Sequence, residues 1–138
     1  MEEQTPFAAV EHLPQAVVVA IIVPYIMDES EVERLRATLL PLAEEKPNGT
    51  IILDFTEVRS LCSGAIGFLV ALKQRLDKGL GRLKICCIQD KIRNTSGDKF
   101  IYEIFKVTKL DKYFDLAPSV SVALRSLATP PQIGLING

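Results

Sequence analysis

One serine stands where a polar turn meets the start of a helix, and its hydroxyl is well placed for chemistry. Residues Ile51–Asp54 form an apolar strand pattern that ends in a carboxylate, and Ser63-Gly64 opens an amphipathic helical pattern. The first turn of a helix has unpaired backbone N–H groups and the positive end of the helix dipole, which both favour negative charge. Ser63 therefore either caps this helix or accepts a phosphate group.

The neighbouring Cys62 and Asp54 offer two further kinds of chemistry. A thiol at a helix N-terminus is a candidate nucleophile, which defines a thiol enzyme as one hypothesis. Phosphatases of the C-x5-R type need an arginine six positions later, where Phe68 stands. We therefore favour a structural cysteine, and iodoacetamide labelling at several pH values tests the choice. Asp54 is either catalytic or, as strand-ending carboxylates often do, caps the following turn.

The other reactive residues do not have the spacing of known sites. Cys86 and Cys87 are adjacent, so on a strand their side chains should point to opposite faces. Without a C-x-x-C pair or a histidine cluster, neither a disulfide framework nor a zinc site is expected. His12, the only histidine, falls in a predicted turn, and no phosphate-binding glycine motif is present. We predict no metal and no cofactor.

Composition restricts the class of protein. The chain has 138 residues, 48% of them hydrophobic, which suffices for one domain with its own core. Sixteen basic and 17 acidic residues argue against nucleic-acid binding. The longest apolar run, Ala16–Val23, is too short to span a bilayer, and Met1–Gln4 lacks the pattern of a signal peptide. We expect a reduced, cytoplasmic protein without a membrane partner.

Apolar strand patterns alternate with helical ones along the chain. The predicted strands are Phe7–Val10, Ala16–Val23, Thr50–Phe55, Arg82–Ile88 and a short edge strand, Tyr113–Leu116. The predicted helices cover about 30–42, 64–78, 100–107 and 118–127, and Gln89–Lys99 is a loop. This alternation predicts an α/β fold, with a mixed, mostly parallel sheet of four to five strands flanked by about four helices. Residues 1–127 form one domain, and 128–138 a loose tail.

Helix ends carry their own signals. Ser30 and Glu33 have the spacing of a capping box, which starts the first helix. Pro41 lies within that helix and should kink or shorten it. The segment Gly79–Gly81 should end the second helix with a glycine in the left-handed conformation. Pro118 suits the first turn of the last helix.

The order of elements and the junction before the second helix resemble a STAS domain, the family typified by bacterial anti-sigma factor antagonists. The family shows a strand ending in Asp, a short turn, then Asp-Ser-Ser/Thr-Gly before a helix. Leu53-Asp54-Phe55 is similar to the strand end, and Ser63 falls on the serine that a partner kinase phosphorylates. Cys62 replaces the family's Asp, and Gly64–Gly67 falls on its Ser/Thr-Gly-Leu-Gly. Val107–Phe114 is similar to the family's Thr-Gly-Leu-Asp-x-x-Phe, with a lysine for the glycine.

The resemblance implies a non-enzymatic protein that works by binding others. It would bind an anti-sigma factor or related serine kinase, accept phosphate on Ser63, and be restored by a PPM-type phosphatase. The expected partner-binding residues surround that serine, with Asp54 supporting the motif: Arg59, Ser60, Cys62, Gly64, Ile66 and Gly67. The two glycines either pack closely inside the domain or admit a partner backbone. An alternative is a divergent scaffold, or a subunit of a signalling or transport assembly, that is never phosphorylated. The oligomeric state stays open.

Overall fold

Five strands form one mixed sheet in the computed structural model, which describes residues 6–87, 105–106 and 108–127. In spatial order they are β1 (Ala8–His12), β2 (Val17–Ile21), β4 (Thr50–Asp54), β6 (Arg82–Cys86) and β7 (Asp115–Ala117). Only β1 runs antiparallel to its neighbour, and the other pairs in this sheet are parallel. The predicted α/β class and mostly parallel sheet are confirmed.

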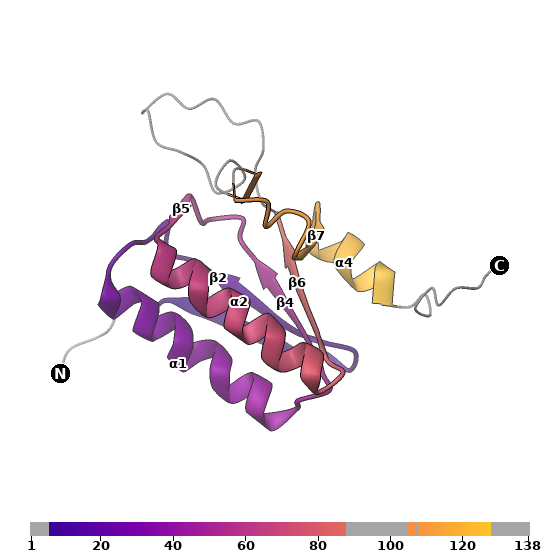
Figure 1. The fold of residues 1–138 in the computed structure, drawn as a ribbon. Helices are drawn as coiled ribbons and strands as arrows, with labels where there is room; N and C mark the ends of the chain where they lie inside the picture. Colours follow the sequence, from indigo (N-terminus) through magenta and orange to yellow (C-terminus); the bar gives the residue numbers. More distant parts are fainter. Residues whose placement is uncertain (1–5, 88–104, 107, 128–138) are drawn as a thin grey trace.

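Helices cover both faces of this sheet (Figure 1). The helices α1 (Glu29–Glu45) and α2 (Ser63–Lys78) lie side by side over one face, and α4 (Val120–Leu127) packs on the other. Successive side chains of a strand point to opposite faces of the sheet, so each central strand contributes to the core on both faces. On β2, for example, Val19 joins the larger core cluster while Val18 joins the cluster beneath α4. Alternate residues of a central strand therefore pack against the helices on opposite faces of the sheet.

The helix count is slightly below the prediction of about four. The described part of the chain contains α1, α2 and α4. The remaining predicted helix, 100–107, falls mostly outside the described residues, within which Phe105 and Lys106 have helical conformation. The predicted loop at 89–99 and tail at 128–138 also lie outside them.

The first helix begins two residues earlier than predicted. Asp28, not Ser30, is its N-cap: the Asp28 carboxylate accepts the Glu31 N–H at 2.9 Å, and the Glu31 carboxylate accepts the Asp28 N–H at 3.2 Å. The Asp28–Glu31 pair has the same spacing as Ser30–Glu33, so the chain offered two capping boxes. The backbone N–H of Met27 also donates to Glu31, at 2.8 Å, which favours the earlier start.

Pro41 does not shorten α1, which continues to Glu45, so the expected shortening is wrong. Proline removes the hydrogen bond to the carbonyl of Ala37. Both residues are exposed, so water can bind the freed carbonyl.

The end of α2 uses its glycines differently from the prediction. Gly79 has φ −88°, and the left-handed residue is Leu80, with φ 64°. The glycines are needed because the chain comes close to a neighbouring turn. A Cβ on Gly79 would lie 2.6 Å from the carbonyl oxygen of Pro47, and one on Gly81 would lie 2.6 Å from that of Gly49.

Two other local predictions need correction. The last helix begins at Val120, not Pro118, because Ser119 precedes it and its hydroxyl accepts the Val122 N–H at 3.2 Å. His12 ends β1, and the turn follows it, with the Leu13 N–H bonded to the Ala16 carbonyl at 2.8 Å.

Candidate functional site

The segment between β4 and α2 is held in place from both sides. It contains the short strand β5 (Ser60–Leu61), which pairs in parallel with β3 (Tyr25–Ile26), and neither strand was predicted. The Phe55 N–H bonds to the carbonyl of Cys86 at 3.0 Å, while Phe55 itself is buried. The predicted partner-binding residues thus lie in a segment whose backbone is fixed by strand pairing.

Ser63 is the first residue of α2 and is exposed. The N-cap position belongs to Cys62, whose side chain makes no capping hydrogen bond, and the first turn holds no acidic residue. The reading of Ser63 as a plain N-cap is therefore wrong, because the helix begins one residue earlier than that role requires. Its hydroxyl lies at the positive N-terminus of a helix whose own first turn supplies no carboxylate.

Beyond Ser63, the exposed side of the first half of α2 is made of very small residues. Gly64, Gly67 and Ala71 are exposed and recur at helical spacing. A Cβ on Gly67 would meet no described atom within 4 Å, and one on Gly64 would make only ordinary contacts at 3.8 Å. Close packing inside the described domain therefore does not require these glycines. Ala71 was missed, although its spacing of four from Gly67 could have indicated it.

The other predicted partner-binding residues lie around the same helix start. Arg59 is exposed, Ser60 is partly buried in β5, and Cys62 and Ile66 are partly buried against the core. The backbone N–H of Cys62 bonds to the carbonyl of Ile26 at 2.9 Å, which fixes the entry to the helix. The structure thus brings this set together at one end of the molecule.

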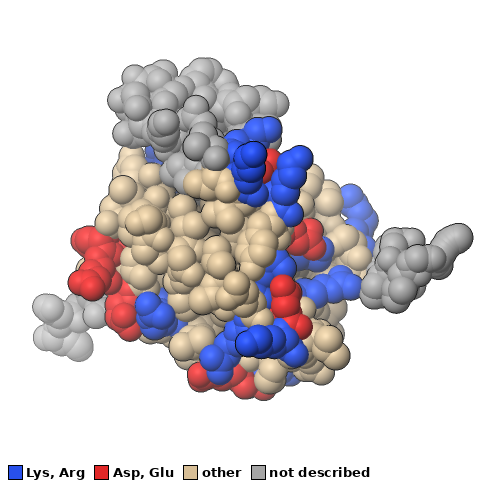
Figure 2. Space-filling view, viewed as in Figure 1, with Lys and Arg blue, Asp and Glu red and all other residues tan. Residues whose placement is uncertain are grey.

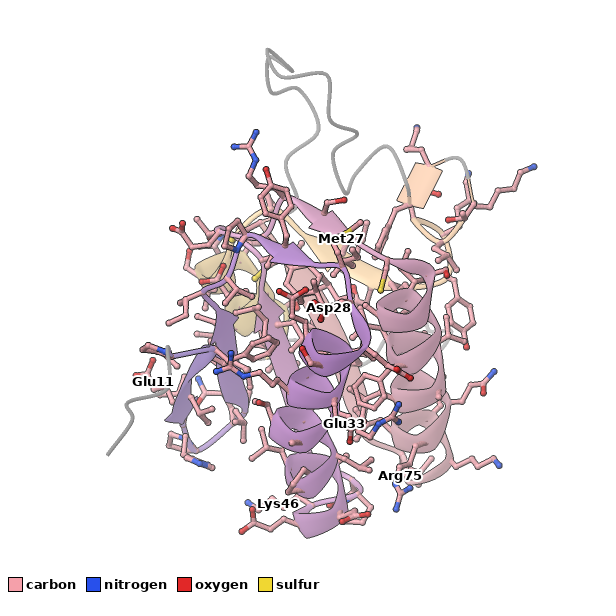
Figure 3. The ribbon with its side chains drawn as sticks, turned by 90° about the vertical axis from the view of Figure 1, so that its left-hand side faces the viewer. Glu11, Met27, Asp28, Glu33, Lys46 and Arg75 are labelled. Atoms are coloured by element: carbon pink, nitrogen blue, oxygen red, sulfur yellow. The ribbon has the colours of Figure 1, made fainter. Side chains whose placement is uncertain are left out.

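An open groove of about 330 Å³ separates the starts of α1 and α2. Its lining is half charged, with three acidic residues and one arginine, and half apolar or small: Asp28, Glu29, Glu33 and Arg36 beside Met27, Val32, Cys62 and Gly64. Figure 3 shows Met27 and Asp28 at the upper end of α1, with Lys46 at the other end. Met27 is a large apolar side chain that is 51% exposed, and no sequence signal marked it. Figure 2 shows a broad uncharged surface with acidic residues at its left margin and basic residues at its upper right.

Asp54 caps the turn that follows its strand, as the simpler reading predicted. One carboxylate oxygen, Oδ1, accepts the backbone N–H of Thr56 at 3.0 Å and its hydroxyl at 2.6 Å. This arrangement orients the carboxylate at the carboxyl end of β4.

The two adjacent cysteines do not point to opposite faces, contrary to the prediction. Cys87 has φ 69°, which breaks the alternation of the strand and turns its thiol toward that of Cys86. The two thiols and the Asp54 carboxylate have ligand atoms within 4.8 Å of one another. Burial raises the pKa of the Cys86 thiol, and the nearby Cys87 and Asp54 raise this pKa further. Cysteine spacing gave no hint of this cluster.

Comparison with known proteins identifies the family. The family model for the STAS domain matches residues 8–123, most of the chain. The chain belongs to the STAS domain family. No curated protein sequence matches it.

Solved STAS structures share the fold at low sequence identity. An anti-sigma-factor antagonist (STAS) domain protein from Planctomyces limnophilus has a TM-score of 0.69 at 21% identity, covering 87% of this chain and 96% of that one. An anti-sigma factor antagonist from Mycobacterium paratuberculosis has a TM-score of 0.68 at 20% identity, covering 88% and 93%. Phosphorylated SpoIIAA, a Bacillus cell fate determinant, has a TM-score of 0.58 at 18% identity, covering 86% and 98%.

The backbone agrees with the family's second sequence motif at one position. The lysine that replaces the family's glycine, Lys109, has φ 63°, in the left-handed region that glycine adopts most readily. The backbone at Lys109 therefore has the conformation expected where the family's motif has glycine.

In the described part of the chain, no helix combines the length and the apolar character needed to cross a membrane.

Proposed function

We propose that this STAS domain is a regulatory protein of the anti-sigma factor antagonist type, controlled by phosphorylation of Ser63. The observation that carries the proposal is the exposed Ser63 hydroxyl at an uncapped helix start, beside a surface of Gly64, Gly67 and Ala71. Solved relatives include SpoIIAA in its unphosphorylated and phosphorylated forms.

The chemistry belongs to the partners. A serine kinase that is itself the anti-sigma factor would bind the unmodified protein and transfer the γ-phosphoryl group of ATP to the Ser63 oxygen. The hydroxyl proton would pass to a base of the kinase, and ADP would leave. A PPM-type phosphatase would hydrolyse the phosphate ester and restore the serine. This chain contributes an acceptor and a docking surface, without catalytic groups, and it meets its ATP-dependent partner in the cytoplasm.

Phosphorylation would release the partner for a steric and electrostatic reason. The phosphate adds about −1.5 to −2 charges and three acceptor oxygens at pH 7. The helix N-terminus tolerates this charge well, so the domain stays folded. A partner backbone packed against Gly64 and Gly67 would instead meet a bulky, hydrated dianion. Arg59, Ser60, Cys62 and Ile66 would form the remainder of the contact.

The first test is phosphopeptide mapping of the protein purified from its native host with phosphatases inhibited. Phosphate on Ser63 supports the proposal, and it should disappear in Ser63→Ala but persist in Ser60→Ala, a serine of the same segment. In binding assays with the co-purified partner, Ser63→Asp should bind at least about tenfold more weakly than Ser63→Asn, a variant of similar size without the charge. Equal binding of these two variants would contradict the switch.

One observation favours a second function. Cys62 stands where the family has Asp, so the carboxylate that normally precedes the acceptor serine is missing. A divergent scaffold, or a subunit of a signalling or transport assembly, would keep the docking surface without the switch. Absence of phosphate on Ser63 across growth and stress conditions, with a partner still attached, is the result expected of such a scaffold.

A further inference from the structure

Three potential metal ligands converge at the carboxyl ends of β4 and β6. They are the carboxylate of Asp54 and the thiols of Cys86 and Cys87, whose ligand atoms all lie within 4.8 Å of one another. We propose that these three residues bind a thiophilic divalent metal ion such as Zn²⁺. Asp54 belongs to the family's motif, but the site uses neither Ser63 nor any residue of the proposed docking surface, so the two proposals can be tested separately.

Sheet register and one unusual backbone conformation build the cluster. Asp54 and Cys86 are direct partners in the parallel β4–β6 pair, so their side chains leave the same face of the sheet. An extended residue after Cys86 would point to the opposite face. Cys87 instead has φ 69°, which is uncommon for a residue other than glycine and brings a third ligand to the cluster. Such conformations concentrate at functional sites.

The ligand types select the metal. Two thiolates and a carboxylate are ligands that Zn²⁺ accepts, with bonds of about 2.3 Å to sulfur and about 2.0–2.2 Å to oxygen. Ligands of one tetrahedral ion lie less than twice these lengths apart, so atoms already within 4.8 Å need only small movements. Mg²⁺ and Ca²⁺ prefer oxygen ligands and are disfavoured here. Three protein ligands leave a fourth position for water or a partner side chain.

The surroundings are suited to an ion. Cys86 is fully buried, and in the metal-free protein its thiol donates to the carbonyl of Leu53 at 3.5 Å; metal binding would release this proton to solvent. A bound cation would compensate the close approach of two thiolates and a carboxylate, which otherwise repel one another. Thr56 holds Oδ1 of Asp54 through two hydrogen bonds, and such outer contacts orient metal ligands. Cys87 is only partly buried, which leaves a route for the ion.

The test is metal titration of the reduced, chelator-treated full chain. We expect one Zn²⁺ per chain by calorimetry, and one Cd²⁺ per chain with the ultraviolet charge-transfer absorption of cadmium bound to thiolates. Affinity should fall more than about 100-fold in Cys87→Ser, which loses a ligand, and about 10–100-fold in Asp54→Asn, which still offers Oδ1 to Thr56. Circular dichroism checks that each variant folds, and Asp54→Asn serves if Cys87→Ser does not.

Matched controls separate this site from other thiols and from the proposed switch. Cys62→Ser removes the cysteine outside the cluster and should leave affinity and absorption unchanged. Ser63→Ala should also bind metal normally, so loss of phosphorylation and loss of metal binding can be told apart. No binding by the unmodified chain would overturn the site. So would unchanged binding by folded Cys87→Ser or Asp54→Asn, or loss of binding in Cys62→Ser.

Discussion

The hydroxyl of Ser63 lies at the positive end of α2. A negative charge at this residue should therefore change the stability of the domain as well as its binding to a partner. Cys62 provides no capping bond, and the first turn has no acidic side chain. A carboxylate in Ser63→Asp should therefore stabilise the domain by about 0.3–1 kcal/mol relative to Ser63→Asn. Urea unfolding measures the difference, and salt should reduce it because the residue is exposed. The same substitution is expected to weaken partner binding, so stability and binding should change in opposite directions. An Asp variant less stable than the Asn variant at low salt would contradict the uncompensated helix end.

Because of the Cys86 thiol, we expect the free energy of unfolding to decrease as pH rises in the alkaline range. Its pKa is raised in the folded state by burial, whereas in the unfolded chain it is near the ordinary value of about 8.5. The folded state therefore keeps a proton that the unfolded state releases. The stabilising contribution is complete below about pH 8.5 and is lost as pH rises above it, by up to about 1.4 kcal/mol per pH unit.

Unfolding of the metal-free chain between pH 8 and 10 tests this dependence. The slope should be smaller in Cys86→Ala, which has no thiol to titrate at this position. Cys62→Ser is the matched control and should keep the slope of the original protein. Equal slopes in all three proteins would show that Cys86 does not cause the dependence.

At the residue scale, the sequence placed Ser63 correctly at the start of a helix but did not reveal the thiol cluster. The position of Ser63 depends on a local pattern, a strand followed by a turn and a helix, which a sequence displays directly. The meeting of Asp54 with Cys86 and Cys87 depends on parallel strand register and on a positive φ at Cys87. The spacing of the residues encodes neither: the whole of α2 separates Asp54 from the two cysteines, and adjacent cysteines on a regular strand would point to opposite faces.

At the element scale, α2 contains glycines of two kinds, and equal substitutions should have opposite effects. Gly67 lies within the helix, where a Cβ meets no described atom within 4 Å. Gly67→Ala should therefore stabilise the domain by up to about 1 kcal/mol. Gly79→Ala should destabilise it, because its Cβ would lie 2.6 Å from the Pro47 carbonyl oxygen and the backbone would have to move. Thermal unfolding of the two variants measures both effects.

The same pair tests the docking surface. Gly67→Ala should weaken partner binding while it stabilises the fold, because the added methyl group separates two close surfaces. Gly79→Ala, at the far end of α2, should leave affinity unchanged in the folded fraction. A Gly67→Ala variant that binds its partner normally would remove this residue from the proposed interface.

Helix ends were the least predictable elements. The apolar stripe located α1, but two overlapping capping boxes competed for its start, and contacts around Glu31 decided between them. Likewise, Gly79 and Gly81 were expected for their φ angles, yet they are needed because Pro47 and Gly49 pass close by. Periodicity is a property of one element, whereas its ends depend on neighbours that sequence reasoning had not yet placed.

At the scale of the whole molecule, the alternation of strands and helices was enough to predict the sheet and its mostly parallel character. Parallel pairing places the carboxyl ends of β2, β4 and β6 at one edge. Because α1 and α2 both start from this edge, the groove between their starts is lined by Cys62 and Gly64, the two neighbours of Ser63 in the sequence. The thiol cluster lies at the ends of β4 and β6, on the face covered by α4. Ligand-binding residues commonly gather at this edge in parallel sheets.

The attachment of β7 to this sheet includes one charged pair with unequal surroundings. The Lys84 ammonium on β6 lies 2.6 Å from the Asp115 carboxylate on β7, and the two side chains are 6% and 54% exposed. Asp115→Ala would leave a buried ammonium without its partner and should cost about 1–3 kcal/mol. Lys84→Met keeps the apolar stem and returns the Asp115 carboxylate to water, so it should change stability by less than about 1 kcal/mol. The variant with both substitutions should resemble Lys84→Met in urea unfolding, because without the buried ammonium the loss of the Asp115 carboxylate leaves no charge unpaired. If Lys84→Met were the more damaging single change, the pair would contribute through attraction and not through relief of a buried charge.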